Sequence, residues 1–270
     1  MLQLSDLNTR VAWAEQLAHA AGKMMLESAH SETLGIRLKL DKTQVTDADE
    51  AINAMVIARV AEQFQDDGVL GEEASAHADR ERLWVCDPID GTDLYILGLP
   101  GAMFSLALVE DGQPVAAAMY EPLLDRMYTA VQGGGAFENG RQIHVSDKTS
   151  LDGAHIAFSP SYKRILPNRA LYDAMVEAGV RLTPINGEAY RGSLTANGVI
   201  DGHAFPGRSA HDVAAVKLIV EEAGGKVTDL NGKDQRYDRI TYGAIISNGH
   251  IHDQLVALLA KFGPENYVGY

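Results

Sequence analysis

The sequence predicts a mixed α/β fold of the α+β type, and three patterns along its 270 residues support that prediction. Near the start of the chain, apolar residues recur at the spacing that forms one buried face of a helix. The middle of the chain consists of short apolar runs separated by glycine-rich turn signals, which is typical of neighbouring strands. After residue 148, segments of helical and strand character alternate. This change predicts two closely packed halves, residues 1–148 and 149–270.

Taken in order, the first half contains two predicted helices and then a series of strands. A helix over 6–28 follows Ser5, a favoured N-cap residue, and a second helix over 48–65 ends at Asp66-Asp67-Gly68. Asp111-Gly112 predicts a hairpin turn between two of the strands. The predicted strands cover residues 69–70, 83–86, 104–109, 115–120, 127–131 and 143–145.

The second half alternates between the two kinds of element. Its predicted strands cover residues 156–158, 181–183, 203–205, 227 and 244–246. Its predicted helices cover residues 169–178, 190–196, 212–223 and 250–262. Gly224-Gly225 ends the third of these helices, because glycine adopts the left-handed conformation that commonly follows a helix.

The overall composition narrows the class of protein. A net charge of −14 argues against nonspecific binding to nucleic acids or anionic membranes. Cys86 is the single cysteine, so an intrachain disulfide is excluded, and its apolar neighbours predict a buried thiol. The chain has neither a run of about 18 apolar residues nor a signal-peptide pattern at its start. We therefore expect a cytoplasmic protein that binds neither nucleic acid nor membranes.

Five acidic residues lie at positions that indicate a shared function. Glu72, Asp87 and Asp90 follow predicted strands, whereas Asp49 and Asp212 lie where helices are predicted to begin. Taken one at a time, each aspartate has a structural explanation, because aspartate is favoured at helix N-caps and in turns, and Glu72 could be an exposed loop acid. Taken together, carboxylates gathered at one edge of a sheet repel one another unless cations lie between them.

Magnesium ions are the cations that best suit this arrangement. Mg²⁺ binds carboxylate oxygens and keeps positions open for water and phosphate, and a pair of metal ions can promote phosphoryl transfer. Asp90, held between Pro88 and Gly91, is a candidate for bridging two ions. Gly91-Thr92 is expected to start a helix whose backbone N–H groups face a phosphate. The residues alone therefore favour a metal-dependent enzyme of phosphoryl transfer.

Several segments together match a known pattern that runs across nearly the whole chain. They are GEE at 71–73, WVCDPIDGT at 84–92, HDVAAVKLIVEEAGG at 211–225, VTDAD at 45–49 and GGGAFENGRQIHVS at 133–146. In their order and spacing they resemble the inositol monophosphatase family. The resemblance implies a five-layered α-β-α-β-α sandwich of the inositol monophosphatase and fructose-1,6-bisphosphatase type. It also implies a Mg²⁺-dependent, lithium-sensitive phosphomonoesterase that forms a homodimer.

The same resemblance implies a role for each of the candidate metal ligands. Glu72, Asp87 and the backbone carbonyl of Ile89 are expected to bind the first of two or three Mg²⁺ ions, and Glu72 is also expected to take part in catalysis. Asp90 and Asp212 are expected to complete a second site. In this assignment Asp87, rather than Asp90, bridges the two ions. Most of these ligands belong to the first half of the chain, and Asp212 belongs to the second.

The resemblance also implies residues that handle water and phosphate. Thr92, paired with Asp49, is expected to orient the attacking water. The backbone N–H groups of Gly91 and Thr92 are expected to bind the phosphate. Water would attack the phosphorus in line, without a covalent phosphoenzyme.

The chain departs from the family pattern where the substrate is expected. Phe205 stands where the family places an acid that binds inositol hydroxyls, which argues against inositol phosphate as the specific substrate. Gly187 and Glu188 lie in a turn expected to touch the substrate, and Glu188 replaces a small residue. Glu188 is therefore a candidate for binding a hydroxyl or an amine.

Four further residues distinguish this chain on the substrate side. Asp93 lies where the substrate side begins, and Arg191 and Arg208 are candidates for a second anionic group or for surface ion pairs. His211 replaces the tryptophan that usually precedes the helix aspartate. We expect His211 to pack against its neighbours or cap the helix rather than to catalyse.

Two classes of function remain open from the sequence. The first is a phosphatase for a small polyol, sugar or amino-alcohol phosphate. Histidinol phosphate, fructose 1,6-bisphosphate and adenosine 3′,5′-bisphosphate remain possible substrates, although the acidic composition disfavours the nucleotide. The second is an interaction or regulatory protein whose phosphatase activity is incidental.

Overall fold

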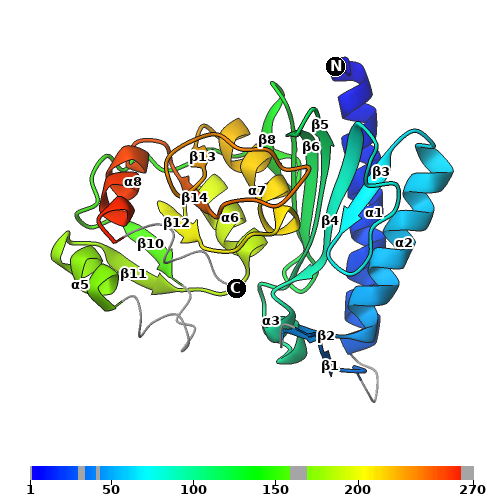
Figure 1. Ribbon diagram of the computed structural model, residues 1–270, viewed down its shortest axis with the longest axis horizontal. Helices are drawn as coiled ribbons and strands as arrows, with labels where there is room; N and C mark the ends of the chain where they lie inside the picture. Colours follow the sequence, from blue (N-terminus) through cyan, green and yellow to red (C-terminus); the bar gives the residue numbers. More distant parts are fainter. Residues whose placement is uncertain (1, 30–33, 41–42, 159–168, 263–270) are drawn as a thin grey trace.

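Apolar residues at helical spacing fold the start of the chain into two helices that pack on one sheet. The computed structural model describes residues 2–29, 34–40, 43–158 and 169–262. Helix α1 (Leu4–Ala29) buries one stripe of side chains that includes Leu7, Leu17 and Met25. Helix α2 (Asp47–Gln63) begins with a capping box formed by Thr46 and Asp49. In Figure 1 the two helices form the outer layer at one end of the molecule.

A seven-stranded sheet lies against α1 and α2 (Figure 1). Its order is β3-β4-β5-β6-β7-β8-β9, and its neighbouring strands are antiparallel except for the parallel pair β3 and β4. The strands are β3 (Gly68–Gly71), β4 (Arg82–Asp90), β5 (Met103–Glu110), β6 (Gln113–Glu121), β7 (Arg126–Val131), β8 (Gly135–Glu138) and β9 (Arg141–Gln142). The central strands are buried on both faces, which explains why they read as nearly continuous apolar runs.

Helices α6 (Glu188–Ala196) and α7 (Ala210–Glu222) lie between this sheet and a second, five-stranded sheet (Figure 1). The order of the second sheet is β11-β10-β12-β14-β13. Its strands are β10 (His155–Phe158), β11 (Arg181–Pro184), β12 (Gly202–Phe205), β13 (Lys226–Thr228) and β14 (Ala244–Ser247). Helices α5 (Arg169–Glu177) and α8 (His252–Ala260) cover its far face.

Successive side chains of each strand point to opposite faces of the sheet, and this divides the apolar residues into separate cores between the layers. In β4, Trp84 and Cys86 face the core under α1 and α2, whereas Leu83 and Val85 face the core that α7 completes. A third core joins the five-stranded sheet to α5 and α8. The layers therefore follow the order α-β-α-β-α, which confirms the predicted five-layered sandwich.

A short strand pair and a short helix lie beside the end of β4 (Figure 1). Strands β1 (Arg37–Leu38) and β2 (Gln44–Val45) form an antiparallel pair, and helix α3 (Thr92–Ile96) follows β4 after Gly91. The start of α3 lies where the sequence predicts a helix after Gly91. These small elements surround the same edge of the seven-stranded sheet at which the acidic residues gather.

Two of the predicted strand boundaries are wrong, for identifiable reasons. The strand predicted over 83–86 continues through the acidic residues to Asp90, because β5 keeps pairing with it beyond an irregularity. The strand predicted over 143–145 is replaced by β9, two residues earlier. Ile143 still donates its N–H to the Ala136 carbonyl (3.0 Å), but Val145 donates to the carbonyl of Ala223 (3.1 Å) after α7, so the chain leaves the sheet there.

Helix α7 packs against the sheet of the other half, across the boundary proposed at residue 148. It belongs to the second half of the chain, yet Val213, Val216 and Val220 share a core with residues of β4, β5 and β6. The division into two halves remains a prediction, and the core that they share is continuous. Within the described ranges, no helix combines the length and apolar character needed to cross a bilayer.

Candidate metal centre and active site

Parallel pairing of β3 and β4 brings Glu72 next to Asp87. Gly71 lies opposite Cys86 in the register, and the Glu72 N–H donates to the Cys86 carbonyl at 3.0 Å. A Cβ atom at Gly71 would lie 2.4 Å from the backbone carbonyl oxygen of Ala74 and 2.3 Å from Oδ1 of Asn53, so only glycine fits where the chain turns toward Glu72. Two strand ends from separate parts of the sequence thus place their carboxylates at one edge of the sheet.

A bulge in β4 separates Asp87 from Asp90. Asp87 pairs with Ser105 and Asp90 with Met103, and the register shifts between them. Pro88 has no N–H to offer the ladder, which suits it to such an irregular position. The Ile89 N–H donates to Oδ1 of Asp87 at 3.0 Å. What the sequence presents as a turn is a bulged strand end that carries both aspartates.

Helix α7 supplies the remaining side chains from the other half of the molecule. Its N-cap is Ser209, and Asp212 lies in its first turn, where the helix dipole favours a negative charge. Neither His211 nor Asp212 therefore occupies the N-cap position.

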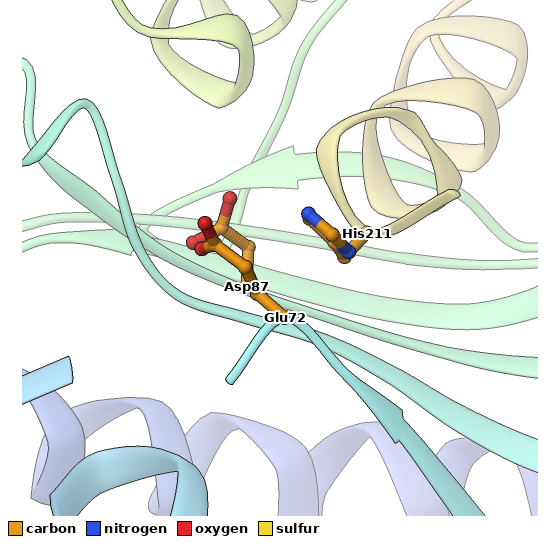
Figure 2. Close-up of side chains that lie close together, drawn as sticks. All are labelled: Glu72, Asp87 and His211. Atoms are coloured by element: carbon orange, nitrogen blue, oxygen red, sulfur yellow. The ribbon is translucent and has the colours of Figure 1, made fainter. Parts of the chain in front are cut away.

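Among the residues that the structure describes, two groups of side chains could each hold a metal ion. One consists of Glu72, Asp87 and His211, and Figure 2 shows these three side chains together. The other consists of Asp87, Asp90 and Asp212. Within each group, one potential ligand atom per residue lies within 4.8 Å of those of the others. Asp87 belongs to both groups.

The carboxylates are poorly tolerated as anions unless positive charge is supplied. Burial, and then the charges of Glu72, Asp90 and Asp212, raise the pKa of Asp87 well above its usual range. Burial and the neighbouring carboxylates likewise raise the pKa of Asp212. Burial and Glu188 raise the pKa of Asp90 to about 7. Oxygen donors with this much mutual repulsion fit a divalent cation.

Asp90 has a further set of contacts at the start of α6. Its carboxylate accepts hydrogen bonds from the backbone N–H groups of Glu188 (3.0 Å) and Ala189 (2.8 Å), which partly offset the rise in its pKa. Gly187, with φ of +83°, makes this approach possible. A Cβ at Gly187 would lie 2.9 Å from the Gly101 carbonyl oxygen and 3.2 Å from Oδ2 of Asp90.

The predicted substrate residues Glu188 and Arg191 lie in a buried polar network. Nη2 of Arg191 donates to Oε2 of Glu188 at 2.6 Å, and Nε2 of His203 lies 2.6 Å from Oε1. Burial lowers the pKa of His203 despite the adjacent carboxylate. Thr195 Oγ1 lies 3.3 Å from Nδ1 of the same ring. Both carboxylate oxygens of Glu188 thus have partners within the protein.

The other residues expected on the substrate side differ in exposure. Phe205 is buried in the core that α7 completes. Asp93, in the first turn of α3, and Arg208 are exposed, and the Arg208 guanidinium lies 6.0 Å from the centre of the Tyr242 ring. The structure therefore brings Asp90, Gly187 and Glu188 together, whereas Arg208 lies on the surface.

The residues expected to handle water have other partners here. The Thr92 hydroxyl donates to the Ile89 carbonyl at 3.2 Å. Oδ2 of Asp49 accepts from the backbone N–H (2.8 Å) and the hydroxyl (2.5 Å) of Thr46. Oδ1 of Asp49 is buried and has no hydrogen-bond partner among the described residues. Burial raises the pKa of Asp49, and its unpartnered Oδ1 can accept a hydrogen bond from water.

Lys39, between β1 and β2, is a neighbour of Glu72 that the sequence does not predict. Its Nζ lies 2.7 Å from Oε1 of Glu72 and 2.5 Å from Oε1 of Glu73. Burial lowers the pKa of Lys39, but the two carboxylates outweigh it and raise the pKa overall. The sequence shows a Lys-rich segment ahead of Asp47, but the spacing of its residues does not predict a contact with Glu72.

Comparison with known proteins agrees with this geometry. The family model described as "Inositol monophosphatase family" matches residues 6–263. The chain is 33% identical to the protein named Nus factor SuhB of Xylella fastidiosa, over 80% of each chain. It is 34% identical to a histidinol-phosphatase of Mycobacterium tuberculosis, over 84% of this chain and 88% of the relative.

A solved structure gives the same result for the fold. The chain superimposes on the IMPase of Thermotoga maritima with a TM-score of 0.84 and 28% identity, covering 96% of this chain and 99% of that one. The match to the family model covers almost the whole chain, including both groups of candidate ligands. The chain therefore belongs to the inositol monophosphatase family, a family of metal-dependent phosphoric monoester hydrolases.

Proposed function

We propose that this chain hydrolyses a small polyol, sugar or amino-alcohol phosphate with the help of Mg²⁺. The observation that supports this most strongly is the position of Asp87, which belongs to both groups of candidate ligands. A carboxylate shared in this way suits two cations held side by side, the arrangement used in many phosphatases.

Residues from three elements would hold the cations. Glu72, Asp87 and the carbonyl of Ile89 would bind one, and Asp90 and Asp212 would complete the site of another, with Asp87 common to both. All of these donors are hard oxygens, which Mg²⁺ prefers. When bound, the cations supply positive charge that favours deprotonation of water and stabilises the departing alkoxide.

The protein groups around the cations position the reactants. Thr92 and Asp49 orient the attacking water, and the unpartnered Oδ1 of Asp49 is an acceptor available for it. The backbone N–H groups of Gly91 and Thr92, at the start of α3, donate to the phosphate oxygens. The N–H groups of Glu188 and Ala189 hold the Asp90 carboxylate in one orientation.

The residues beyond the phosphate support the proposed substrate class. Glu188 and Arg191 bring a polar, charged pair next to Asp90, whereas Phe205 contributes no polar group. The similarity to a histidinol-phosphatase supports an amino-alcohol phosphate within this class. Inositol 1-phosphate remains the natural comparison substrate.

A phosphate-release assay tests the proposal. The panel contains inositol 1-phosphate, histidinol phosphate, fructose 1,6-bisphosphate and adenosine 3′,5′-bisphosphate, each with Mg²⁺, with EDTA and with added Li⁺. We expect Mg²⁺-dependent turnover of at least one ester, inhibition by Li⁺, and loss of turnover in Asp90→Asn. Full activity in EDTA would contradict the metal-dependent mechanism.

A second candidate is a role as a binding partner of other macromolecules. The similarity to a protein named Nus factor SuhB favours it. No turnover across the panel, from a protein that binds Mg²⁺ and unfolds cooperatively, would support this role over catalysis.

We also propose that the chain forms a homodimer. Exposed leucines at Leu97, Leu99, Leu123 and Leu124 offer an apolar surface. The buried Glu121 connects the loop of Leu97 and Leu99 to the loop of Leu123 and Leu124. It accepts hydrogen bonds from the N–H groups of Gly101 and Leu124. Light scattering coupled to size-exclusion chromatography would give a dimer mass, and glutamate at Leu97 and Leu123 would shift it to a monomer.

A further inference from the structure

His211 points toward the candidate metal centre from α7. One of its ring nitrogens lies within 4.8 Å of a carboxylate oxygen of Glu72 and of one of Asp87. Figure 2 shows the imidazole at the end of the helix, opposite the two carboxylates that come from the sheet. Three separate elements therefore converge on one small volume.

Within the described part of the chain, the ring nitrogens of His211 have no hydrogen-bond partner, unlike those of the buried histidines His203 and His252. Both nitrogens of His203 have partners, Glu188 at 2.6 Å and Thr195 at 3.3 Å. Both nitrogens of His252 have hydroxyl partners at 2.9 Å. Among the described residues, no hydrogen bond or ion pair is made by the imidazole of His211, although the residue is partly buried. An imidazole in that position has a nitrogen to offer to a ligand.

Capping of helix α7 does not account for the position of His211. Ser209 holds the N-cap position of α7, and His211 follows two residues later, inside the first turn. Burying an imidazole without hydrogen-bond partners carries a cost, which a metal ion on its nitrogen would remove.

We propose that His211 is a further protein ligand, through a ring nitrogen, to the cation that Glu72, Asp87 and the Ile89 carbonyl would hold. This inference rests on the metal centre of the proposed function and adds to it the choice of metal. Two carboxylates and one imidazole form a mixed oxygen and nitrogen set. An imidazole nitrogen binds Mn²⁺ and the later first-row transition-metal ions in preference to Mg²⁺. The group of Asp87, Asp90 and Asp212 offers only oxygens and remains suited to Mg²⁺.

Lys39 is the positive charge already present near this site. Its ammonium group contacts Oε1 of Glu72 but is shared with Glu73. A carboxylate has two oxygens, so Glu72 can keep Lys39 on one and a cation on the other. Asp87 and His211 have no contact of this kind with Lys39 within the described residues.

Pulsed electron paramagnetic resonance on Mn²⁺ tests the inference directly. Metal-free protein is loaded with less than one equivalent of Mn²⁺, and coupling to a coordinated imidazole nitrogen is measured for the wild type, His211→Asn and His211→Gln. The control variant is His250→Asn, an exposed histidine away from the site. We expect nitrogen coupling in the wild type and in the control, and none in either His211 variant.

Calorimetric titrations provide the second measurement. Loss of even a residue that only supports a metal ligand typically costs about 10–100-fold in affinity, so we expect Mn²⁺ binding to weaken at least ~10-fold in His211→Asn. We expect Mg²⁺ binding to change much less, so that the preference for Mn²⁺ over Mg²⁺ falls. Melting curves of the variants in EDTA establish that they are folded.

The outcomes separate this inference from the proposed function. Mn²⁺ binding without nitrogen coupling in the wild type, or coupling that persists in both His211 variants, would overturn the role of His211 and leave the phosphatase proposal intact. Failure of the folded wild type to bind either Mn²⁺ or Mg²⁺ would overturn both.

Discussion

Asp212 is a candidate metal ligand whose ionised form is unfavourable in the metal-free fold. Burial and the surrounding carboxylates raise its pKa, because each of these makes the anion less stable. Its folded-state pKa therefore lies above its unfolded-state value. The folded chain therefore holds the Asp212 proton more tightly than the unfolded chain does. The contribution of this residue to the free energy of unfolding is present at low pH and is lost as the pH rises through the folded-state pKa.

Replacing Asp212 by asparagine should therefore have opposite effects on stability and on activity. In EDTA we expect Asp212→Asn to unfold at a higher temperature than the wild type at pH 8, and the difference to shrink toward pH 5. A gain of 1 kcal/mol corresponds to roughly 2–4 °C in Tm for a domain of about this size. With Mg²⁺ we expect kcat/KM to fall more than ~100-fold, since a direct ligand is worth at least as much as a supporting residue.

The control for this prediction is Asp79→Asn, which changes an exposed acid. It should alter neither the Tm difference nor the activity. A wild type and Asp212→Asn pair with equal Tm at pH 8 in EDTA would show that the carboxylate is not strained in the metal-free fold.

His252 makes a pH-dependent contribution far from the site. Its two ring nitrogens lie 2.9 Å from the hydroxyls of Thr228 and Ser247, and burial lowers its pKa from 6.5 to about 4. Between these values the unfolded chain binds a proton that the folded chain excludes. The free energy of unfolding should therefore fall as the pH decreases from 6.5 to 4, by about 3 kcal/mol for this residue. Urea unfolding should show a steeper loss in the wild type than in His252→Gln, with His250→Gln behaving as the wild type.

At the scale of elements, the junction of α6 with β4 depends on glycine. Gly187 and Gly91 both have φ of +83°, and Gly187 lies against the Gly101 carbonyl and Asp90. These contacts let the start of α6 donate two N–H groups to Asp90. The orientation of a proposed metal ligand thus depends on how closely two backbones approach.

A methyl group at Gly187 should disturb this junction. Gly187→Ala should lose about 1–3 kcal/mol of stability from the positive φ alone. Because its Cβ would also lie 2.9 Å from Gly101 and 3.2 Å from Asp90, we expect kcat/KM to fall at least ~10-fold. Gly140→Ala is the matched control, since Gly140 has φ of +76° and no atom within 4 Å of the added methyl. Equal activity of the two variants would remove Gly187 from the positioning of Asp90.

The same elements show what could be predicted from the sequence. Periodicity located the long helices and the central strands, because burial on defined faces leaves a repeating pattern. The bulge between Asp87 and Asp90 could not be predicted, since it depends on how far β5 continues to pair. Nor could the positions of Lys39 and His211, which reach Glu72 only through tertiary packing of β1, β2 and α7. The clustering of Glu72, Asp87, Asp90 and Asp212 was predictable, because acids that follow strands or begin helices gather at one edge of a sheet.

At the scale of the whole molecule, the candidate metal ligands come from both of the predicted halves of the chain. Asp87 and Asp90 belong to β4 of the seven-stranded sheet and Glu72 directly follows β3, whereas His211 and Asp212 come from a helix that follows residue 148. That helix also shares a core with the same sheet. A bound cation would therefore link the two halves at a point where packing already joins them.

Cation binding should consequently stabilise the molecule as one unit. A ligand that binds only the folded state adds about 2.7 kcal/mol at 100 times its Kd, which corresponds to roughly 5–10 °C in Tm. We expect Mg²⁺ at that excess to raise the Tm of the wild type in a single transition. Asp87→Asn should show little of this shift, because Asp87 belongs to both groups of ligands. A shift confined to one of two separate transitions would mean that the halves unfold independently, and an equal shift in Asp87→Asn would place the cation elsewhere.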